Sequence, residues 1–320
     1  MTISLGVVMD ALSTIHVKKD STIAMLEEAQ RRGWTNYFFE QKDIFLQNGE
    51  AYGRARQITL FLDKDSWFTL SEPHDIPLAD LSVILMRKDP PFDLDYIYTT
   101  YLLEQAERKG TLIINKPQSL RDANEKLFTA WFEACCPPTL VTQNKEIFKA
   151  FFQQHEDIVC KPLDSMGGRG VFRLQKGDMN ASVVFEMLTQ HGTHYMMAQK
   201  FIPEIKQGDK RILLINGEPV PFALARIPAE GELRGNLVAG ATGVAQPLTT
   251  RDRWICQQVG PVLREKGLWF VGLDVIGDFL TEINVTSPTC IREIEAQCTI
   301  NISALLLTTI EQQLASTNIT

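Results

Sequence analysis

The stretch that decides the fold of this chain reads Gly272-Leu273-Asp274-Val275-Ile276-Gly277-Asp278-Phe279-Leu280-Thr281-Glu282-Ile283-Asn284-Val285-Thr286. Two apolar, strand-forming runs flank a Gly-Asp turn, which predicts a β-hairpin. Asp274 lies on the first strand, and Glu282 and Asn284 lie on the second. Carboxylate and amide oxygens are the ligands that Mg²⁺ prefers. The hairpin therefore predicts a metal site with Asp274, Glu282 and Asn284 as ligands.

The register of this hairpin decides whether the three oxygens share one face. A two-residue Gly-Asp loop places Asp274 opposite Thr281, so that Asp274 and Glu282 point to different sides. A three-residue loop that includes Phe279, or a β-bulge, places Asp274 opposite Glu282. Apolar residues alternate with the oxygen ligands, so one face is core and the other faces a cleft or water. A solvated polar face is the alternative to a metal site.

The composition is that of a soluble globular enzyme with room for two or three lobes. The chain has 320 residues, 44% hydrophobic and 22% charged. Its net charge of −7 argues against nucleic acid as the main partner, because duplex binding rests on a basic surface. The six cysteines form no Cys-x-x-Cys pair, which predicts reduced thiols. The first ten residues predict a core strand and not a signal, and no apolar run reaches the roughly 20 residues of a membrane span. We therefore expect a cytoplasmic protein with no membrane association.

The hydrophobic pattern predicts an α/β first third and a strand-rich remainder. Strands alternate with helices at first, which predicts a parallel α/β lobe. Segment 119–124 is expected to lead into a helix that runs through Trp131. Short strands with glycine turns are expected from Asp157 onward, among them a hairpin at Asn216-Gly217. The glycine-rich segment 229–243 lacks apolar periodicity and predicts a mobile loop. The expected strands are 3–9, 37–40, 83–87, 111–115, 158–162, 171–174, 195–201, 211–215 and 219–225, and the other expected helices are 21–32, 96–108, 250–266 and 300–314.

Several cationic and glycine positions favour a nucleotide. The Gly167-Gly168-Arg169-Gly170 loop can lay backbone N–H groups along phosphates, and its alternative is a plain flexible turn. Lys126 and Lys161 lie near element ends, where an ammonium group suits a phosphate, although each taken singly is more typical of a solvated surface lysine. Neither a Rossmann nor a Walker glycine pattern is present. The segment Gln199, Lys200, Phe201 and Ile202 predicts a strand whose backbone can read an adenine edge, or a strand that only fills core.

Three arginines complete the candidate set. Arg211 and Arg226 are embedded in apolar strands, where an unpaired charge is costly. This favours either a bound ligand or an internal salt bridge, and the sequence does not separate the two. Arg234, in the glycine-rich segment, also suits a solvated loop charge. Arginine pairs bidentately with carboxylate or phosphate.

Long strings of sequence carry a family resemblance over nearly the whole chain. The strings are Met86-Arg87-Lys88-Asp89-Pro90-Pro91-Phe92-Asp93, Asn115-Lys116-Pro117-Gln118-Ser119-Leu120-Arg121-Asp122, Asn124-Glu125-Lys126-Leu127-Phe128-Thr129, Lys161-Pro162-Leu163-Asp164 with its glycine loop, and Thr281-Glu282-Ile283-Asn284-Val285-Thr286-Ser287-Pro288-Thr289. On these residues the chain resembles the bacterial glutathione synthetase family of the ATP-grasp superfamily. It departs from that family at Gly240-Ala241-Thr242-Gly243-Val244, where a further arginine is familiar.

The resemblance implies a fold of mixed α/β and α+β class in three lobes. These are an N-terminal parallel α/β substrate-binding lobe over 1–122, a central ATP-grasp lid lobe over 123–200, and a C-terminal antiparallel lobe with the metal site over 201–320. It implies an ATP-dependent carboxylate–amine ligase that joins γ-glutamylcysteine to glycine through an acyl phosphate. Mg²⁺ or Mn²⁺ is the implied cofactor, ATP a cosubstrate, and a homotetramer the implied assembly.

The resemblance also implies residue roles. Asp274, Glu282 and Asn284 would hold the metal, and segment 229–243 would close over the site. Nucleotide binding is implied for Lys126, Lys161, Gly167, Gly168, Gln199, Lys200, Phe201, Ile202 and Arg211. A catalytic role is implied for Arg211, Arg226 and Arg234, and substrate binding for Arg87, Asp89, Arg226, Arg234, Ser287, Pro288 and Thr289.

Three other functions remain open on the sequence. Another ATP-grasp ligase, adding glutamate or D-alanine, would share the ATP half and differ in the N-terminal pocket. An ATP-binding regulator without catalysis would not need the three intact oxygen ligands. A Rossmann-type dehydrogenase is suggested only by the α/β first lobe, and the missing glycine fingerprint argues against it.

Overall fold

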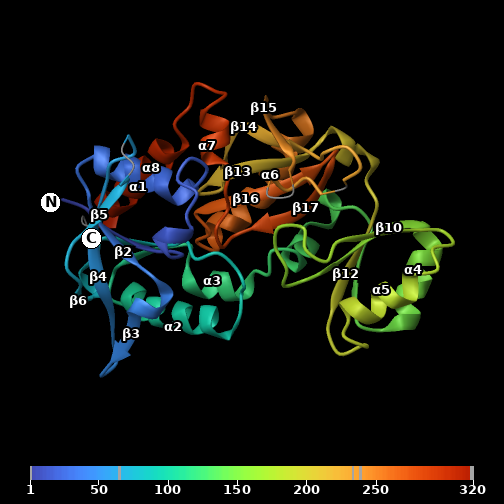
Figure 1. The fold of residues 1–320 in the computed structure, drawn as a ribbon, viewed down its shortest axis with the longest axis horizontal. Helices are drawn as coiled ribbons and strands as arrows, with labels where there is room; N and C mark the ends of the chain where they lie inside the picture. The colour runs from blue at the N-terminus through green and yellow to red at the C-terminus, as the bar shows by residue number, and fades with distance from the viewer. Residues whose placement is uncertain (1, 64–65, 233, 238–239, 318–320) are drawn as a thin grey trace.

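The computed structural model describes residues 2–63, 66–232, 234–237 and 240–317. These residues form three β-sheets, each accompanied by helices, and the three follow one another along the chain (Figure 1). In the described part of the chain, no helix combines the length and the apolar character needed to span a bilayer.

The N-terminal sheet is parallel at its centre and antiparallel at one side. Its order is β3-β4-β2-β1-β7-β8, with β5 and β6 paired to β4. Strands β2, β1, β7 and β8 are parallel, which confirms the predicted parallel α/β lobe. The antiparallel strands β3 to β6 were not predicted. The elements are β1 (Ser4–Val8), β2 (Thr35–Phe39), β3 (Ile44–Gln47), β4 (Glu50–Leu60), β5 (Phe68–Leu70), β6 (His74–Pro77), β7 (Val83–Met86), β8 (Leu112–Ile114), α1 (Ser21–Arg31), α2 (Leu94–Arg108), α3 (Pro117–Asp122), and the 3₁₀ helices η1 (Leu12–Thr14), η2 (Gln41–Asp43) and η3 (Leu78–Asp80).

The central sheet is antiparallel and has a core of its own. Its order is β11-β10-β12-β9. Phe148 and Phe185, from the two helices beside the sheet, stack with ring centroids 5.0 Å apart and pack against Ile158 and Ala198 of the strands. The two helices were not predicted. The elements are β9 (Thr139–Thr142), β10 (Asp157–Pro162), β11 (Phe172–Gln175), β12 (Met196–Lys200), α4 (Lys145–His155) and α5 (Ala181–Leu188).

The C-terminal sheet is fully antiparallel, in the order β15-β14-β13-β16-β17. Asn216 and Gly217, at φ of 48° and 79°, form the predicted hairpin turn between β13 and β14. The elements are β13 (Asp209–Ile215), β14 (Glu218–Ile227), β15 (Thr242–Pro247), β16 (Phe270–Ile276), β17 (Phe279–Asn284), α6 (Thr250–Glu265), α7 (Ile291–Glu295), α8 (Ile302–Thr317) and the 3₁₀ helix η5 (Pro203–Gln207).

The first and last parts of the chain share their hydrophobic cores. One cluster joins Phe39 of β2 to Val275 of β16, and the other joins Leu26 of α1 to Leu306 and Ile310 of α8. Helix α8 lies beside α1 in Figure 1, at the opposite end of the chain from it. The N-terminal and C-terminal sheets are therefore packed as one body, and the central lobe stands apart.

The helix predicted to follow segment 119–124 and to run through Trp131 is a 3₁₀ helix, and it is separate from the short helix before it. Helix α3 ends at Asp122, and a 3₁₀ helix, η4 (Leu127–Cys135), starts afresh. The break has a local cause: the Asn124 side-chain oxygen accepts hydrogen bonds from the backbone N–H groups of Lys126, at 3.1 Å, and Leu127, at 2.9 Å. Lys126 thus lies at the start of η4, and its side chain points toward the central lobe, where it contacts Ser165.

A cluster of charged side chains centred on the buried Glu28 joins α1 to α8. The Glu28 carboxylate accepts hydrogen bonds from Arg31, at 2.7 and 2.8 Å, and from Arg32, at 2.8 Å. Arg32 in turn donates to Glu311 at 2.7 Å and to the carbonyl of Ala304 at 2.8 Å. The hydrogen bond from Arg31, helped by Arg32 and opposed by burial, lowers the pKa of Glu28 to about 2.

We expect Glu28→Gln to lower the free energy of unfolding by about 2 kcal/mol at pH 7. The folded-state pKa lies below the unfolded value, so the stabilisation is complete above about pH 4.5 and is lost as the pH falls toward 2. Urea unfolding of the variant and the parent between about pH 2.5 and 7 should show the difference shrinking below about pH 4.5. Glu27→Gln, on the same helix and 48% exposed beside Arg292, should change the stability by less than about 1 kcal/mol. A difference for Glu28→Gln that is constant with pH would contradict the assignment.

Candidate functional site

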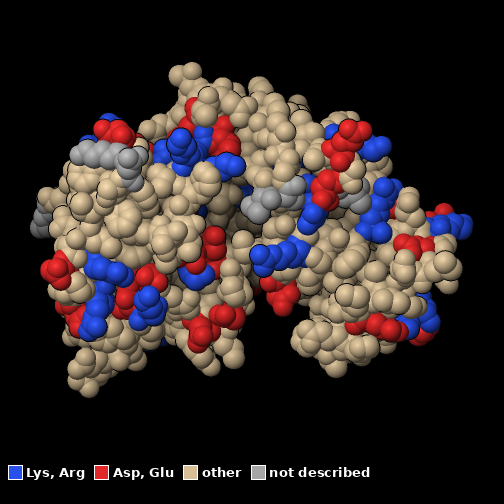
Figure 2. All heavy atoms as spheres, viewed as in Figure 1, with Lys and Arg blue, Asp and Glu red and all other residues tan. Residues whose placement is uncertain are grey.

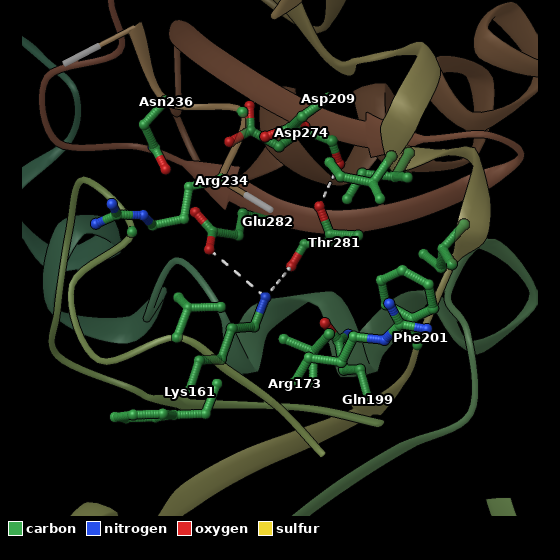
Figure 3. Close-up of a pocket in the computed structure, with 18 of the residues that line it drawn as sticks. Lys161, Arg173, Gln199, Phe201, Asp209, Arg234, Asn236, Asp274, Thr281 and Glu282 are labelled. Carbon is green, nitrogen blue, oxygen red and sulfur yellow. Dashed lines mark hydrogen bonds and ion pairs between the residues drawn. The ribbon is translucent and has the colours of Figure 1, made fainter. Parts of the chain in front are cut away.

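A cavity of about 420 Å³ lies between the central and C-terminal sheets. Strands β10 and β12 and the glycine loop form one side, and β13, β16 and β17 form the other (Figure 3). Figure 2 shows a hollow in the middle of the molecule with lysine and arginine atoms at its upper edge. The predicted site residues that line the cavity are Lys126, Lys161, Gly167, Gly168, Gln199, Lys200, Phe201, Ile202, Arg234, Asp274 and Glu282.

The β16–β17 hairpin combines a two-residue turn with a β-bulge. Ile276 pairs with Phe279 across the Gly-Asp turn, and the register then shifts so that Asp274 pairs with Glu282. Thr281 is the extra residue. Its hydroxyl donates to the Asp274 carbonyl at 3.1 Å, and its own carbonyl accepts from Lys161 Nζ at 3.3 Å. The bulge turns Asp274 and Glu282 toward the same cavity, as Figure 3 shows.

Asp274 is held by two arginines. Arg211 donates to it bidentately, at 2.5 and 2.9 Å, and Arg226 Nη2 lies 3.0 Å from Oδ2. Gly272 makes this possible, because a Cβ there would lie 2.8 Å from the Arg211 side chain. Burial alone would raise the pKa of Asp274, but the two guanidinium groups outweigh it and hold the pKa below its ordinary value. Of the two possibilities for Arg211 and Arg226, the structure contains the internal salt bridge.

The donor set of the hairpin fits a hard divalent cation. Glu282 is 26% exposed and faces the cavity. Asn284 uses its amide nitrogen, which donates to the Gly272 carbonyl at 3.2 Å, and so keeps its oxygen as an acceptor. Asp274 Oδ1 accepts from Arg211 alone and keeps a second lone pair, whereas Oδ2 is engaged by both arginines. Within the described residues no cluster of three His, Cys, Asp or Glu exists, so a cation here would take two carboxylates and one amide.

Two buried lysines converge on Glu282 from the other side of the cavity. Lys161 Nζ lies 3.5 Å from Glu282 Oε1, and Lys126 Nζ lies 3.9 Å from the same atom. Lys126 also donates to the Ser165 carbonyl at 2.5 Å. Burial lowers the pKa of Lys161, and Glu282 partly restores it. Two ammonium groups share one carboxylate here, and the excess positive charge suits a polyphosphate.

The predicted adenine strand forms the inner wall. Gln199 is buried, and its side-chain amide donates to the Thr139 hydroxyl at 3.1 Å. The Phe201 ring lies under the Arg173 guanidinium, 3.6 Å from it, and Arg173 is fixed by a bidentate pair with Asp157. This gives the cavity a flat, partly apolar end of the kind that a purine ring fits.

The segment predicted as a lid contributes described residues to the lining of the cavity. It includes residues 233, 238 and 239, which lie outside the described residues, and Thr242 already belongs to β15. Arg234 pairs with Glu232 at 2.6 Å, and both line the cavity. A Cβ on Gly168 would lie 2.6 Å from Asn236 Oδ1, and one on Gly235 would lie 2.7 Å from Asp209 Cβ. The segment therefore touches the glycine loop on one side and β13 on the other.

The sequence analysis missed Asp209. Its Oδ2 accepts from Arg226 at 2.5 Å, while Oδ1 is buried without a hydrogen-bond partner among the described residues. Burial, opposed by Arg226, raises the pKa of Asp209 to about 6. The signal was available, because Asp209 and Arg211 are two residues apart on one strand and so share a face. Arg173, Asn236 and Thr281 line the cavity and were also missed.

The predicted substrate residues of the N-terminal lobe lie outside this cavity, behind the hairpin. Arg87 is buried, and donates to the Pro288 carbonyl at 2.9 Å and the Thr22 hydroxyl at 3.1 Å. Among the described residues it has no carboxylate partner, and burial lowers its pKa. Asp89, with Ser287 as its hydrogen-bond partner, has a pKa raised by burial. A buried guanidinium bound only to neutral oxygens suits an anionic ligand.

Two family models match the chain. The model described as prokaryotic glutathione synthetase, N-terminal domain, matches residues 3–121, and that described as prokaryotic glutathione synthetase, ATP-grasp domain, matches residues 125–299. A glutathione synthetase of Escherichia coli is 59% identical over 312 residues, covering 98% of this chain and 99% of the relative. One from Pseudomonas aeruginosa is 58% identical over 316 residues, covering 99% and 100%.

Solved structures show the same fold at low identity. A D-cycloserine synthetase is similar with a TM-score of 0.69 at 13% identity, covering 97% of this chain and 99% of that one. A RimK domain ATP-grasp protein from Sphaerobacter thermophilus is similar with a TM-score of 0.61 at 13% identity, covering 95% and 97%. These similarities concern the fold alone.

Proposed function

Because this chain belongs to the prokaryotic glutathione synthetase family, we propose that the 420 Å³ cavity binds ATP in the pose that its charges favour. The fold is the ATP-grasp fold, and the activity is the ATP-dependent ligation of γ-glutamylcysteine to glycine, giving glutathione, ADP and phosphate. The observation that carries the pose is the convergence of Lys126 and Lys161 on Glu282 at one end of the cavity. The phosphates would lie at that end, and the adenine beside Gln199 and Phe201 at the other.

The remaining walls suit the rest of the nucleotide. The backbone N–H groups of Gly167 and Gly168 would face phosphate oxygens, because a glycine leaves them unobstructed. Asp209 Oδ1, an acceptor that lacks a partner among the described residues, would accept hydrogen bonds from the ribose hydroxyls. Lys200 and Ile202 would border the adenine, and Arg234 would reach the phosphates from the covering segment.

We assign Mg²⁺ or Mn²⁺ to Asp274, Glu282 and Asn284, and a bound cation would neutralise charge on the transferred phosphoryl oxygens. Arg211 would hold Asp274 in place and add positive charge near the phosphates. Arg226 would do the same from β14. In this reading both arginines act where charge spreads in the transition state, which is the main need of phosphoryl transfer.

The dipeptide would bind between the N-terminal lobe and the 287–289 loop. Arg87 would pair with a substrate carboxylate, and Asp89 with its amino group, with Ser287, Pro288 and Thr289 forming the wall. The cysteinyl carboxylate attacks the γ-phosphate to give an acyl phosphate and ADP, and the glycine amine then displaces phosphate. Segment 229–243, closed over the site, would keep water from the acyl phosphate.

The broader organisation follows the same family. We propose lobes over 1–122, 123–200 and 201–320, a homotetrameric assembly and a cytoplasmic location. The central lobe in this division carries the glycine loop, and the last carries the metal hairpin.

One assay tests the function and its acceptor. ADP release should require ATP, a divalent cation, γ-glutamylcysteine and glycine together, and omission of any one should reduce it to background. Glutamate or D-alanine offered in place of glycine should not restore the rate. Release with either of these and not with glycine would identify another ATP-grasp ligase, and nucleotide binding without turnover would identify a regulator.

A further inference from the structure

Glu125 is the residue of the Asn124-Glu125-Lys126 string to which the activity assigns no role. Its carboxylate Oε1 accepts three hydrogen bonds, from the backbone N–H of Val285 at 2.8 Å, the backbone N–H of Thr286 at 3.0 Å and the Thr286 hydroxyl at 2.9 Å. Its backbone carbonyl accepts a fourth, from the N–H of Ile283 at 2.8 Å. A single residue thus binds four donors of one short segment.

The segment that Glu125 binds adjoins both the proposed metal site and the 287–289 loop. Ile283 and Val285 flank Asn284, so both neighbours of one proposed metal ligand are held by Glu125. Thr286 leads directly into the 287–289 loop, whose Pro288 carbonyl is bound by Arg87. The residue after Glu125 is Lys126, whose ammonium group lies 3.9 Å from Glu282.

Glu125 holds the segment from one side, and Asn115 holds it from the other. The Asn115 amide donates to the Val285 carbonyl at 2.6 Å and to the Phe270 carbonyl at 2.9 Å. Val285 is therefore fixed through both its N–H and its carbonyl by residues that come from outside the C-terminal sheet. Val285 follows the last residue of β17, an edge strand, so without Glu125 and Asn115 these two groups would have no partner from the sheet.

We propose that Glu125 is a positioning residue, which sets the spacing between the Lys126 ammonium group and the oxygens of Glu282 and Asn284. It does so by acceptor geometry, and touches neither the metal nor the nucleotide itself. This inference rests on the proposed assignment of the metal to the β16–β17 hairpin. Groups that orient metal ligands through hydrogen bonds typically account for roughly 10- to 100-fold in metal affinity or activity.

The test is a titration of the full-length enzyme with Mn²⁺ in the presence of ADP, followed by electron paramagnetic resonance, beside kcat and Tm. Glu125→Ala should weaken Mn²⁺ binding by about tenfold or more and lower kcat by a similar factor. Glu125→Gln keeps an oxygen acceptor in the same place and should stay within about threefold of the parent. Thr286→Val removes only one of the bonds and should give a smaller loss in the same direction, and it serves as the test if Glu125→Ala does not fold.

Glu295 provides a matched control. Its Oε1 accepts from the backbone N–H groups of Ile302, at 2.7 Å, and Ser303, at 3.4 Å, and holds a chain segment in the same manner away from the cavity. Burial raises the pKa of both carboxyl groups above the ordinary glutamate value. Glu295→Ala should lower Tm as Glu125→Ala does and leave Mn²⁺ affinity and kcat within about twofold.

Two results would overturn the inference. One is that Glu125→Ala and Glu295→Ala lower Tm alike and both keep the parent Mn²⁺ affinity. The other is that Glu125→Gln loses as much as Glu125→Ala, which would make the charge and not the acceptor geometry responsible. Glu282→Ala separates this from a failure of the metal assignment, because unchanged Mn²⁺ binding in that variant would reject the assignment itself.

Discussion

Replacing Glu282 with alanine is expected to lower kcat by roughly 100- to 1,000-fold or more while the protein stays folded. Lys126 and Lys161 converge on this carboxylate, which is more exposed than that of Asp274. Its removal would take away a metal ligand and leave two ammonium groups close together without their shared counter-ion. The side chain contributes little to the core, because 26% of it is exposed. ADP release at ordinary Mg²⁺ and a thermal melt are the measurements.

Asp278→Ala is the control for this change. Asp278 is an exposed carboxylate in the turn of the same hairpin and does not line the cavity. That variant should keep its activity within about twofold, since a surface substitution away from a site is usually silent. A folded Glu282→Ala protein with near-normal turnover would falsify the metal assignment.

Arg226→Met is expected to lower the free energy of unfolding by roughly 3–5 kcal/mol. The guanidinium is 4% exposed and is bound to both Asp209 and Asp274, at 2.5 and 3.0 Å. The methionine fills the space but leaves Asp209 as a buried carboxylate without its cation, and an uncompensated buried charge is the costly outcome. Urea unfolding at pH 7 measures the loss, and kcat/KM should fall as well.

Arg54→Met gives the exposed counterpart. Arg54 also forms a bidentate pair with a carboxylate, Asp75, at 2.9 and 3.2 Å, but the two side chains are 60% and 42% exposed. Its loss should cost less than about 1 kcal/mol. If Arg226→Met kept the parent stability and reduced only kcat/KM, the arginine would be a ligand contact whose internal ion pairs contribute nothing.

For the β16–β17 hairpin, the sequence predicted the strands and the face of the oxygen ligands, but not the local geometry that sets the register. Alternation of apolar and oxygen-bearing residues predicted the two strands and the face that carries Asp274 and Glu282. The pattern could not choose between a longer loop and a β-bulge, because both restore the same register. The structure has the β-bulge, with Thr281 as the extra residue. The Thr281 carbonyl accepts from Lys161, and the Thr281 hydroxyl donates to the Asp274 carbonyl.

Other differences arise where long-range contacts override local pattern. The short helix α3 was not predicted, and the Asn124 side chain separates it from η4 by accepting from the backbone N–H groups of Lys126 and Leu127. Helices α4 and α5 were missed among short strands, although Asn144 caps α4 by accepting from two backbone N–H groups. The spacing of Asp209 and Arg211 showed that they share a face, but it could not show that Arg226 of the neighbouring strand is the partner of Asp209.

The separate core of the central lobe has a consequence for local unfolding and for rigid-body motion of the lobe. Its hydrophobic cluster consists of residues from β9–β12 and its own two helices, whereas the clusters elsewhere mix the two ends of the chain. Amide hydrogens of this lobe should therefore exchange as one cooperative block, at a lower free energy than those of the fused body. The lobe can rotate as a rigid body without exposing either of the two large hydrophobic clusters. Nucleotide entry and product release would then require only a separation of the loops that contact each other across the cavity. Thermal unfolding of the enzyme should accordingly begin in the central lobe, while the N-terminal and C-terminal sheets remain folded together.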